Sequence, residues 1–224
     1  MALNIAKGDM YDFVTHTWNT TRGICSHFCS YCYMKDIGFK HSVKFMSNEL
    51  NTDLGNGNFI FVGSSCDMFA KNIPSEWIAQ TLQHCYRFDK NYLFQTKNPE
   101  RYLEFIDSGL YTEKMGFCTT IETNRHYPDI MKLSPTPIER ANAMNLVSKS
   151  VRTLVTIEPI MDFDLDELID LVKMCNPMLV IIGADSKKHE LPEPDRDKIL
   201  ALINELTKFV RVIQKSNLKR LLNH

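Results

Sequence analysis

Three cysteines crowd into a short stretch near the start of the chain: Cys25, Cys29 and Cys32. Their CxxxCxxC spacing puts three thiolates on one tight loop, where they can bind neighbouring corners of a single iron–sulfur cubane. Because such clusters are normally held by four cysteines, three would leave one iron without a protein ligand. An open coordination position is typical of a catalytic metal site rather than a closed structural one. The spacing therefore predicts a catalytic [4Fe–4S] cluster.

The same residue types admit other interpretations. Zinc could be held by the three cysteines together with His27 or His41, although zinc knuckles usually bring a second CxxC pair and this chain has none. A disulfide would leave the third cysteine unpaired, and an odd total of seven cysteines does not suggest a secreted disulfide framework. The four remaining cysteines stand alone, as small buried hydrophobes usually do. Of these, Cys66 and Cys118 come near predicted strand ends, where a thiol could donate a hydrogen atom.

The bulk composition is that of an ordinary globular protein. The chain has 224 residues, of which 44% are hydrophobic, and this suits one domain with a sizeable core. A formal net charge of −1 gives no overall attraction to nucleic acid or anionic membranes. Locally, no acidic residue follows Glu205, whereas five basic residues do: Lys208, Arg211, Lys215, Lys219 and Arg220. This pattern predicts a short basic extension over about 209–224, which either contacts phosphates or forms a solvated terminal helix.

The N-terminal residues carry no apolar signal-peptide core and no small-residue cleavage site. No stretch approaches the roughly 18 apolar residues that a membrane span needs. We therefore expect a cytoplasmic protein without a membrane partner.

Short apolar runs alternate with amphipathic stretches along most of the chain. The apolar runs predict strands at 12–18, 58–63, 92–96, 115–121, 151–157, 178–182 and 209–213. The amphipathic stretches predict helices at 74–88, 98–107, 137–148, 164–174 and 196–208, the second with Asn98 as its N-cap. Five or six βα units in a row imply a parallel sheet with right-handed crossovers, in either an open doubly wound sheet or a closed or partial barrel.

Polar residues recur where the apolar strands stop. The predicted strand ends read Gly63-Ser64-Ser65-Cys66-Asp67, Gln95-Thr96-Lys97, Glu122-Thr123-Asn124, Glu158-Pro159 and Gly183-Ala184-Asp185. Parallel α/β sheets carry their sites at the carboxyl ends of the strands. Five polar endings in register therefore predict one functional site.

Tyr31, an aromatic residue directly before the third cysteine, completes the motif. With it, CxxxCxxC resembles the signature of the radical S-adenosylmethionine (SAM) superfamily. The resemblance implies that the three thiolates bind [4Fe–4S], that the amino and carboxylate groups of SAM chelate the open iron, and that Tyr31 packs near the adenine. It also implies reductive cleavage of SAM to methionine and a 5′-deoxyadenosyl radical that abstracts hydrogen from a substrate. The partner would be a reductant such as flavodoxin or ferredoxin.

Further segments resemble one phage-associated radical SAM family of unassigned function. They are TWN before the cysteine loop, FVGSSCDMF followed by IPSEWI, QTKNPERY, TTIETN and TIEPIMD, in this order across most of residues 17–185. The resemblance implies one radical SAM domain over 1–224, with a partial (β/α)6 TIM-like barrel as its fold.

By the same resemblance, Gly63, Ser64 and Ser65 occupy the glycine-rich strand end that meets the SAM amino group. A turn of small residues lets backbone carbonyls approach a ligand closely. This chain has GSS where the superfamily has two glycines and an acid, so Asp67 is a candidate for the missing acceptor.

The resemblance also implies roles for four polar residues further along the chain. Glu122 and Asn124 look like the readers of the ribose hydroxyls, since a carboxylate and an amide suit a diol. Glu158 resembles a further polar group on the SAM side or the substrate side. Arg140 is a candidate partner for the SAM carboxylate.

The substrate stays open at this point. The phage-type resemblance and the basic C-terminal segment favour a nucleotide or nucleic acid, in modification or repair. A small metabolite or peptide is the alternative within the same chemistry. A non-catalytic iron–sulfur or zinc-binding protein is the alternative outside it.

Overall fold

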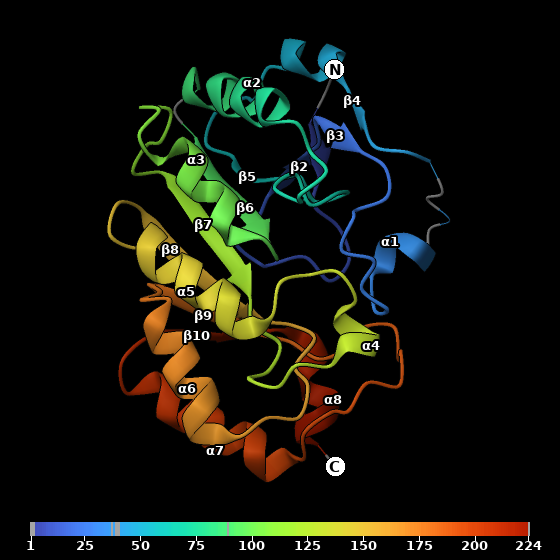
Figure 1. Ribbon diagram of the computed structural model, residues 1–224, viewed down its shortest axis with the longest axis vertical. Coiled ribbons are helices and arrows are strands. Elements are labelled where there is room, and N and C mark those ends of the chain that lie inside the picture. The colour runs from blue at the N-terminus through green and yellow to red at the C-terminus, as the bar shows by residue number, and fades with distance from the viewer. Residues whose placement is uncertain (1–2, 37, 39–40, 89, 224) are drawn as a thin grey trace.

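A computed structural model describes residues 3–36, 38, 41–88 and 90–223. Its centre is an eight-stranded sheet in the order β1-β2-β5-β6-β7-β8-β9-β10 (Figure 1). The strands are β1 (Asn4–Ile5), β2 (His16–Trp18), β5 (Phe59–Val62), β6 (Asn91–Thr96), β7 (Met115–Thr120), β8 (Arg152–Ile157), β9 (Leu179–Ile182) and β10 (Arg211–Gln214). Only β1 is antiparallel to its neighbour, so the sheet is mostly parallel, as the alternation predicted.

A helical segment that leads to the next strand follows each strand from β5 to β9, with the short α4 (Pro128–Met131) as an additional helix after β7. These segments are α2 (Ser75–Tyr86), the 3-10 helix η2 (Pro99–Tyr102) with α3 (Leu103–Ile106), α5 (Pro137–Val147), α6 (Leu165–Met174) and α7 (Arg196–Thr207). Short elements complete the chain: β3 (Thr21–Arg22) paired with β4 (Lys44–Phe45), α1 (Tyr33–Asp36), η1 (Ser47–Asn51), α4 (Pro128–Met131), η3 (Ser216–Leu218) and α8 (Lys219–Leu222). The predicted βα units are confirmed, with boundaries shifted by a few residues.

Different parts of the chain pack against the two faces of the sheet. Alternate strand residues such as Ile60 and Val62 pack into the large core beneath the helices. Their neighbours Phe59 and Phe61 point to the opposite face, where they pack with the N-terminal residues Tyr11 and Val14. Helices α2, α3, α5, α6 and α7 accordingly line one outer side of the curved sheet, whereas α1 and α4 lie on the other side (Figure 1).

A doubly wound sheet would have its connecting helices on both faces, whereas here the five helical segments that connect the strands from β5 to β10 lie on one side (Figure 1). Among the described residues no backbone pairing joins β1 to β10, so the sheet does not close into a full barrel. The fold is therefore α/β with an open, mostly parallel sheet, and it is compatible with a partial barrel.

Local sequence explains where two of the longer helices, α5 and α7, begin. Thr136 and Glu139 form a reciprocal capping box at α5, and Asp195 accepts from the Lys198 backbone N–H at α7. The N-cap prediction for Asn98 is wrong in its contact, because no side-chain capping bond forms there. The Asn98 side chain instead donates to the carbonyl of Phe69, and the helix begins as a 3-10 turn.

The basic segment predicted as a C-terminal extension is built into the domain. It contributes β10, the edge strand of the sheet, followed by η3 and α8. Several of its charges have partners: Lys208 pairs with Glu205, and Arg220 with Glu193. No helix in the described part of the chain is long and apolar enough to cross a membrane.

Candidate functional site

A cavity of about 590 Å³ opens at the carboxyl end of the sheet. Every strand from β5 to β10 contributes its end, through Gly63, Thr96, Thr120, Glu158, Ala184 and Lys215. The loop that carries the cysteine motif forms the opposite wall. Four of the five predicted polar strand ends thus meet at this cavity, whereas the ending Glu122-Thr123-Asn124 is absent from its lining.

All three motif cysteines line this cavity, and none is in a disulfide. Hydrogen bonds from Phe28 N to Cys25 O and from Cys32 N to Cys29 O bend the loop into successive tight turns. Helix α4 supports it from behind, since Ser30 N donates to the carbonyl of Ile130 at 2.9 Å.

Burial favours the protonated form of two thiols of this loop, those of Cys25 and Cys29. Burial raises the pKa of Cys25, and the negative charge of Asp67 raises it further. Burial also raises the pKa of Cys29, although the Lys97 ammonium acts against this shift. A bound metal reverses such shifts, because it coordinates the thiolate and releases the proton.

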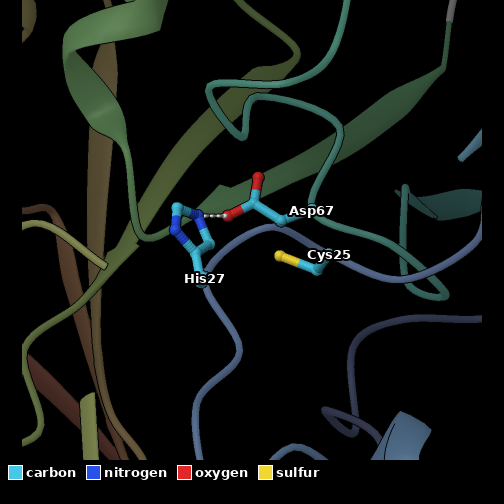
Figure 2. A group of neighbouring side chains, drawn as sticks. All are labelled: Cys25, His27 and Asp67. Atoms are coloured by element: carbon cyan, nitrogen blue, oxygen red, sulfur yellow. Dashed lines mark hydrogen bonds and ion pairs between the residues drawn. The ribbon is translucent and has the colours of Figure 1, made fainter. Parts of the chain in front are cut away.

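His27 and Asp67 tie the cysteine loop to the sheet (Figure 2). Asp67 Oδ2 lies 2.9 Å from His27 Nε2 and accepts further hydrogen bonds from the Thr96 hydroxyl and the Lys97 N–H. Its Oδ1 accepts from Phe69 N at 3.0 Å. Burial by itself would raise the pKa of Asp67, but the hydrogen bond and charge of His27 hold it below its ordinary value.

Cys25, His27 and Asp67 are also ligand types for zinc, and their ligand atoms lie within 4.8 Å of one another. Both carboxylate oxygens of Asp67 already accept hydrogen bonds, and one of them binds His27. An ion at this place would have to replace those bonds. His41, the other predicted zinc ligand, is exposed and joins the loop through its carbonyl, which accepts from Ile24 N.

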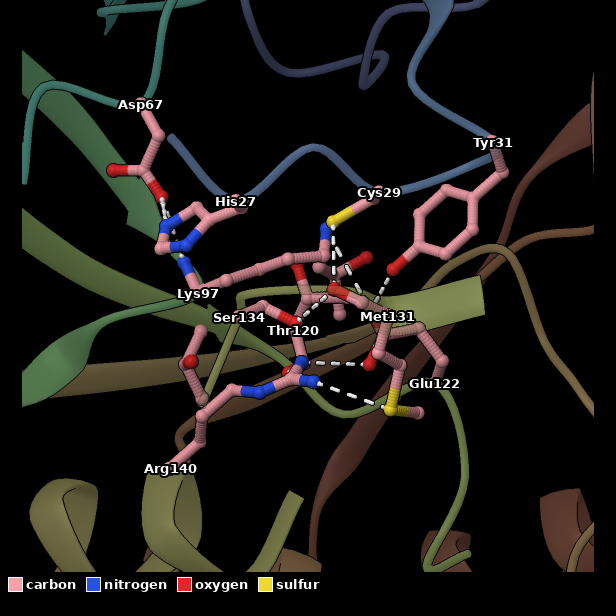
Figure 3. Close-up of polar contacts among 12 residues, drawn as sticks. His27, Cys29, Tyr31, Asp67, Lys97, Thr120, Glu122, Met131, Ser134 and Arg140 are labelled. Atoms are coloured by element: carbon pink, nitrogen blue, oxygen red, sulfur yellow. Dashed lines mark hydrogen bonds and ion pairs between the residues drawn. The ribbon is translucent and has the colours of Figure 1, made fainter. Parts of the chain in front are cut away.

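A second polar network lies beneath the loop (Figure 3). Arg140 Nη1 lies 2.6 Å from Glu122 Oε2, and both side chains are fully buried. The hydroxyl of Tyr31 donates to the same carboxylate. Lys97 Nζ lies 3.6 Å from Glu122 Oε1 and 5.1 Å from the centre of the Tyr31 ring. Burial would raise the pKa of Glu122, but the charges of Arg140 and Lys97 keep it lowered.

A third group lies at the far end of the cavity. Lys215 Nζ lies 2.6 Å from Glu158 Oε1 and 2.6 Å from the carbonyl of Asp9. Burial raises the pKa of Glu158 although Lys215 and Asn217 act against this shift. Gly183 makes room for this carboxylate, because a Cβ there would lie 2.8 Å from Glu158 Oε1.

The structure therefore divides the predicted site residues into two sets. On the cavity lie Cys25, Cys29, Cys32, Tyr31, Gly63, Ser64, Ser65 and Glu158. The other three predicted residues are absent from the lining: Glu122 and Arg140 are enclosed in their ion pair, and Asn124 donates to Asp164 and Glu167. Their expected contacts with SAM stay predictions.

Sequence reasoning missed two residues that shape the cavity. Lys215 directly follows the last apolar run, so the polar strand-end pattern could have found it. Asn19, the last residue of the TWN segment, holds the turn after β5: its Oδ1 accepts from Ser65 N at 2.8 Å. Nothing in the spacing of Asn19 and Ser65 indicates this contact.

Comparison with protein-family models and with curated proteins found no match to this chain. The chemistry of the site is therefore inferred from the residues it contains and from the motif they form.

Proposed function

We propose that this chain is a radical SAM enzyme in which Cys25, Cys29 and Cys32 hold a [4Fe–4S] cluster. One observation carries the proposal: three free thiols on one loop face a cavity to which six consecutive parallel strands contribute their ends. The donor set fits the cluster, because three thiolates leave one iron open for a ligand. When bound, the cluster and SAM supply an electron transfer that cleaves the sulfonium and yields a carbon radical able to abstract hydrogen. The fold of this proposal is a partial (β/α)6 barrel.

The cavity residues have distinct tasks in this proposal. The ring of Tyr31 forms the wall beside the adenine, and its hydroxyl is fixed by Glu122, so the ring cannot swing freely. The turn that begins at Gly63 offers its carbonyls to the SAM amino group. Gly63 has a φ of +82°, a backbone conformation that side chains disfavour, and glycine therefore suits this turn.

We assign Glu122 and Arg140 to the support of the cysteine loop rather than to SAM. The two side chains form an ion pair with each other, and neither is exposed. Glu158 is the carboxylate on the cavity, where its partners Lys215 and Asn217 leave it in a polar setting that suits hydroxyl groups.

The substrate that we propose is a nucleotide or a nucleic acid end presented to the cavity. Lys7 and Lys187 both line the cavity and are exposed, and within the described chain the ammonium group of neither has a hydrogen bond or ion pair. Two free ammonium groups at a cavity mouth suit phosphate oxygens. Three of the five C-terminal basic residues, Lys208, Lys215 and Arg220, are paired with acidic side chains, which favours a small nucleotide over a long duplex. A small metabolite or peptide is the alternative, and flavodoxin or ferredoxin is the proposed reductant.

The test is anaerobic reconstitution with iron and sulfide, reduction with dithionite, and measurement of 5′-deoxyadenosine formed from SAM. Formation that disappears in Cys29→Ala supports the proposal, with Cys175→Ala, a thiol in the core away from the cavity, as the matched control. Zinc in the isolated protein, or a cluster that never cleaves SAM, would overturn it. Added nucleotides should raise the rate of 5′-deoxyadenosine formation, and Lys7→Gln with Lys187→Gln should reduce that rise.

A further inference from the structure

Cys66 lies outside the CxxxCxxC motif but lines the same cavity as its three cysteines. It belongs to the turn that follows β5, and its side chain is buried. The other cysteines outside the motif, Cys85, Cys118 and Cys175, are enclosed in the core and absent from the lining. The cavity is therefore lined by four thiols, of which the motif accounts for three.

Contacts on both sides of Cys66 tie its turn to the cysteine loop. One residue after it, Asp67 accepts the hydrogen bond from His27 at 2.9 Å. Two residues before it, the Ser64 carbonyl accepts a hydrogen bond from the hydroxyl of Tyr33, which follows Cys32. Because the two ties flank Cys66, its turn is held against the loop that carries the other three thiols.

The turn itself is also well defined. Cys66 N donates to the carbonyl of Gly63 at 3.3 Å, and the Asn19 side chain hydrogen-bonds both intervening residues, Ser64 and Ser65. Among the described residues the Cys66 sulfur makes one weak hydrogen bond, to the carbonyl of Asp67 at 3.9 Å. A thiol with so little hydrogen bonding is available as a ligand.

We propose that Cys66 is a fourth thiolate ligand of the iron–sulfur cluster, at the iron that the three motif cysteines leave open. This inference rests on the proposed function, since it requires the cluster. SAM must take the same position through its amino and carboxylate groups. On that exchange the bond between iron and the Cys66 sulfur breaks, and the released thiolate takes up one proton from solvent. In the absence of SAM, Cys66 protects the cluster from losing its fourth iron.

The experiment compares the wild type with Cys66→Ala, Cys66→Ser and the control Cys175→Ala, each reconstituted without oxygen. Electron paramagnetic resonance spectra of the reduced cluster are recorded without and with SAM. Each protein is then oxidised mildly, and the fraction of three-iron cluster is measured. Far-ultraviolet circular dichroism verifies that each variant is folded.

Without SAM, we expect the spectrum of the wild type to differ from the spectra of both Cys66 variants. Once SAM is bound, the three spectra should be alike. The three-iron fraction without SAM should rise several-fold in Cys66→Ala and less in Cys66→Ser, whose hydroxyl can still ligate iron. SAM should suppress the rise. Cys175→Ala should match the wild type.

The outcomes separate this inference from the proposed function. If all variants share one SAM-free spectrum and one three-iron fraction while still cleaving SAM, Cys66 is no ligand and the inference fails alone. If no protein binds a four-iron cluster, the proposed function fails and the inference falls with it. A third outcome is that SAM never changes the wild-type spectrum and that Cys66→Ala loses the cluster. Cys66 would then be a permanent ligand. That result would overturn both the radical SAM function and the proposed replacement of Cys66 by SAM.

Discussion

Tyr31 and Arg140 reach the same carboxylate, that of Glu122, from opposite sides. Tyr31 belongs to the cysteine loop, Glu122 follows β7, and Arg140 lies in α5. One buried acidic side chain thereby joins a loop, a strand end and a helix that are far apart in the sequence. The position of the cysteine loop depends on this carboxylate as well as on the His27–Asp67 tie.

Replacing Glu122 by glutamine should destabilise the protein strongly. The change preserves the shape of the side chain but leaves the fully buried Arg140 without its counter-charge. Breaking a buried ion pair by removing one partner costs about 3–5 kcal/mol. Urea denaturation measures the change in the free energy of unfolding. The exposed Glu113→Gln is the control and should stay within about 0.5 kcal/mol of the wild type.

Acid should destabilise the fold through Glu122 and Asp67. Both have folded-state pKa values below their ordinary values of 4.5 and 3.8, so the folded protein binds fewer protons there than the unfolded chain. Their stabilisation is full above those ordinary values and is lost as the pH falls through the lowered folded-state values. Urea denaturation across a pH series should show this fall, and a shallower one in Asp67→Asn. Identical slopes for Asp67→Asn and wild type would contradict this role of Asp67.

Removing the His27 side chain should weaken metal loading without unfolding the protein. His27→Ala removes the bond to Asp67 that holds the cysteine loop on the sheet. Loss of a residue that orients ligands costs at least about tenfold in metal affinity. Iron per chain after reconstitution at limiting iron measures the effect, and the exposed His126→Ala serves as the control. Equal iron contents would show that the loop keeps its geometry without this tie.

Gly183→Ala should disturb the far end of the cavity. The new Cβ would lie 2.8 Å from the carboxyl carbon of Glu158, so one of the two must move. Overpacking of this kind costs about 1–3 kcal/mol. The double variant Gly183→Ala with Glu158→Ala should show less than the sum of the two single losses of stability, because the clash is gone. If the two losses of stability are additive, the effect of Gly183→Ala does not come from a clash with Glu158.

The succession of strands and helices could be predicted because each element carries its own local pattern. The apolar run at Leu179–Ile182 and the amphipathic stretch at Leu165–Met174 are examples. The meeting of the strand ends followed from the parallel topology alone. The sequence motif also identified the cysteines and Tyr31 that line the cavity.

The partners of charged residues could not be predicted in the same way. Glu122 and Arg140 were expected at the SAM site as separate groups, whereas the structure encloses them with each other. Their pairing depends on how α5 packs against β7, which no local pattern encodes. The contact of Asn19 with the turn after β5 is likewise tertiary, since the two residues are 46 positions apart.

Lys215 and Asn217, just beyond β10, bind Asp9 in the segment that follows β1. These two strands are the edges of the sheet, so side chains bridge the place where a closed barrel would have a ladder of backbone hydrogen bonds. These side-chain contacts between the two edges can break when water replaces a few polar partners, and both edge strands stay intact. The cavity beside it can therefore widen for a bulky guest while the wall that carries the cysteines stays in place.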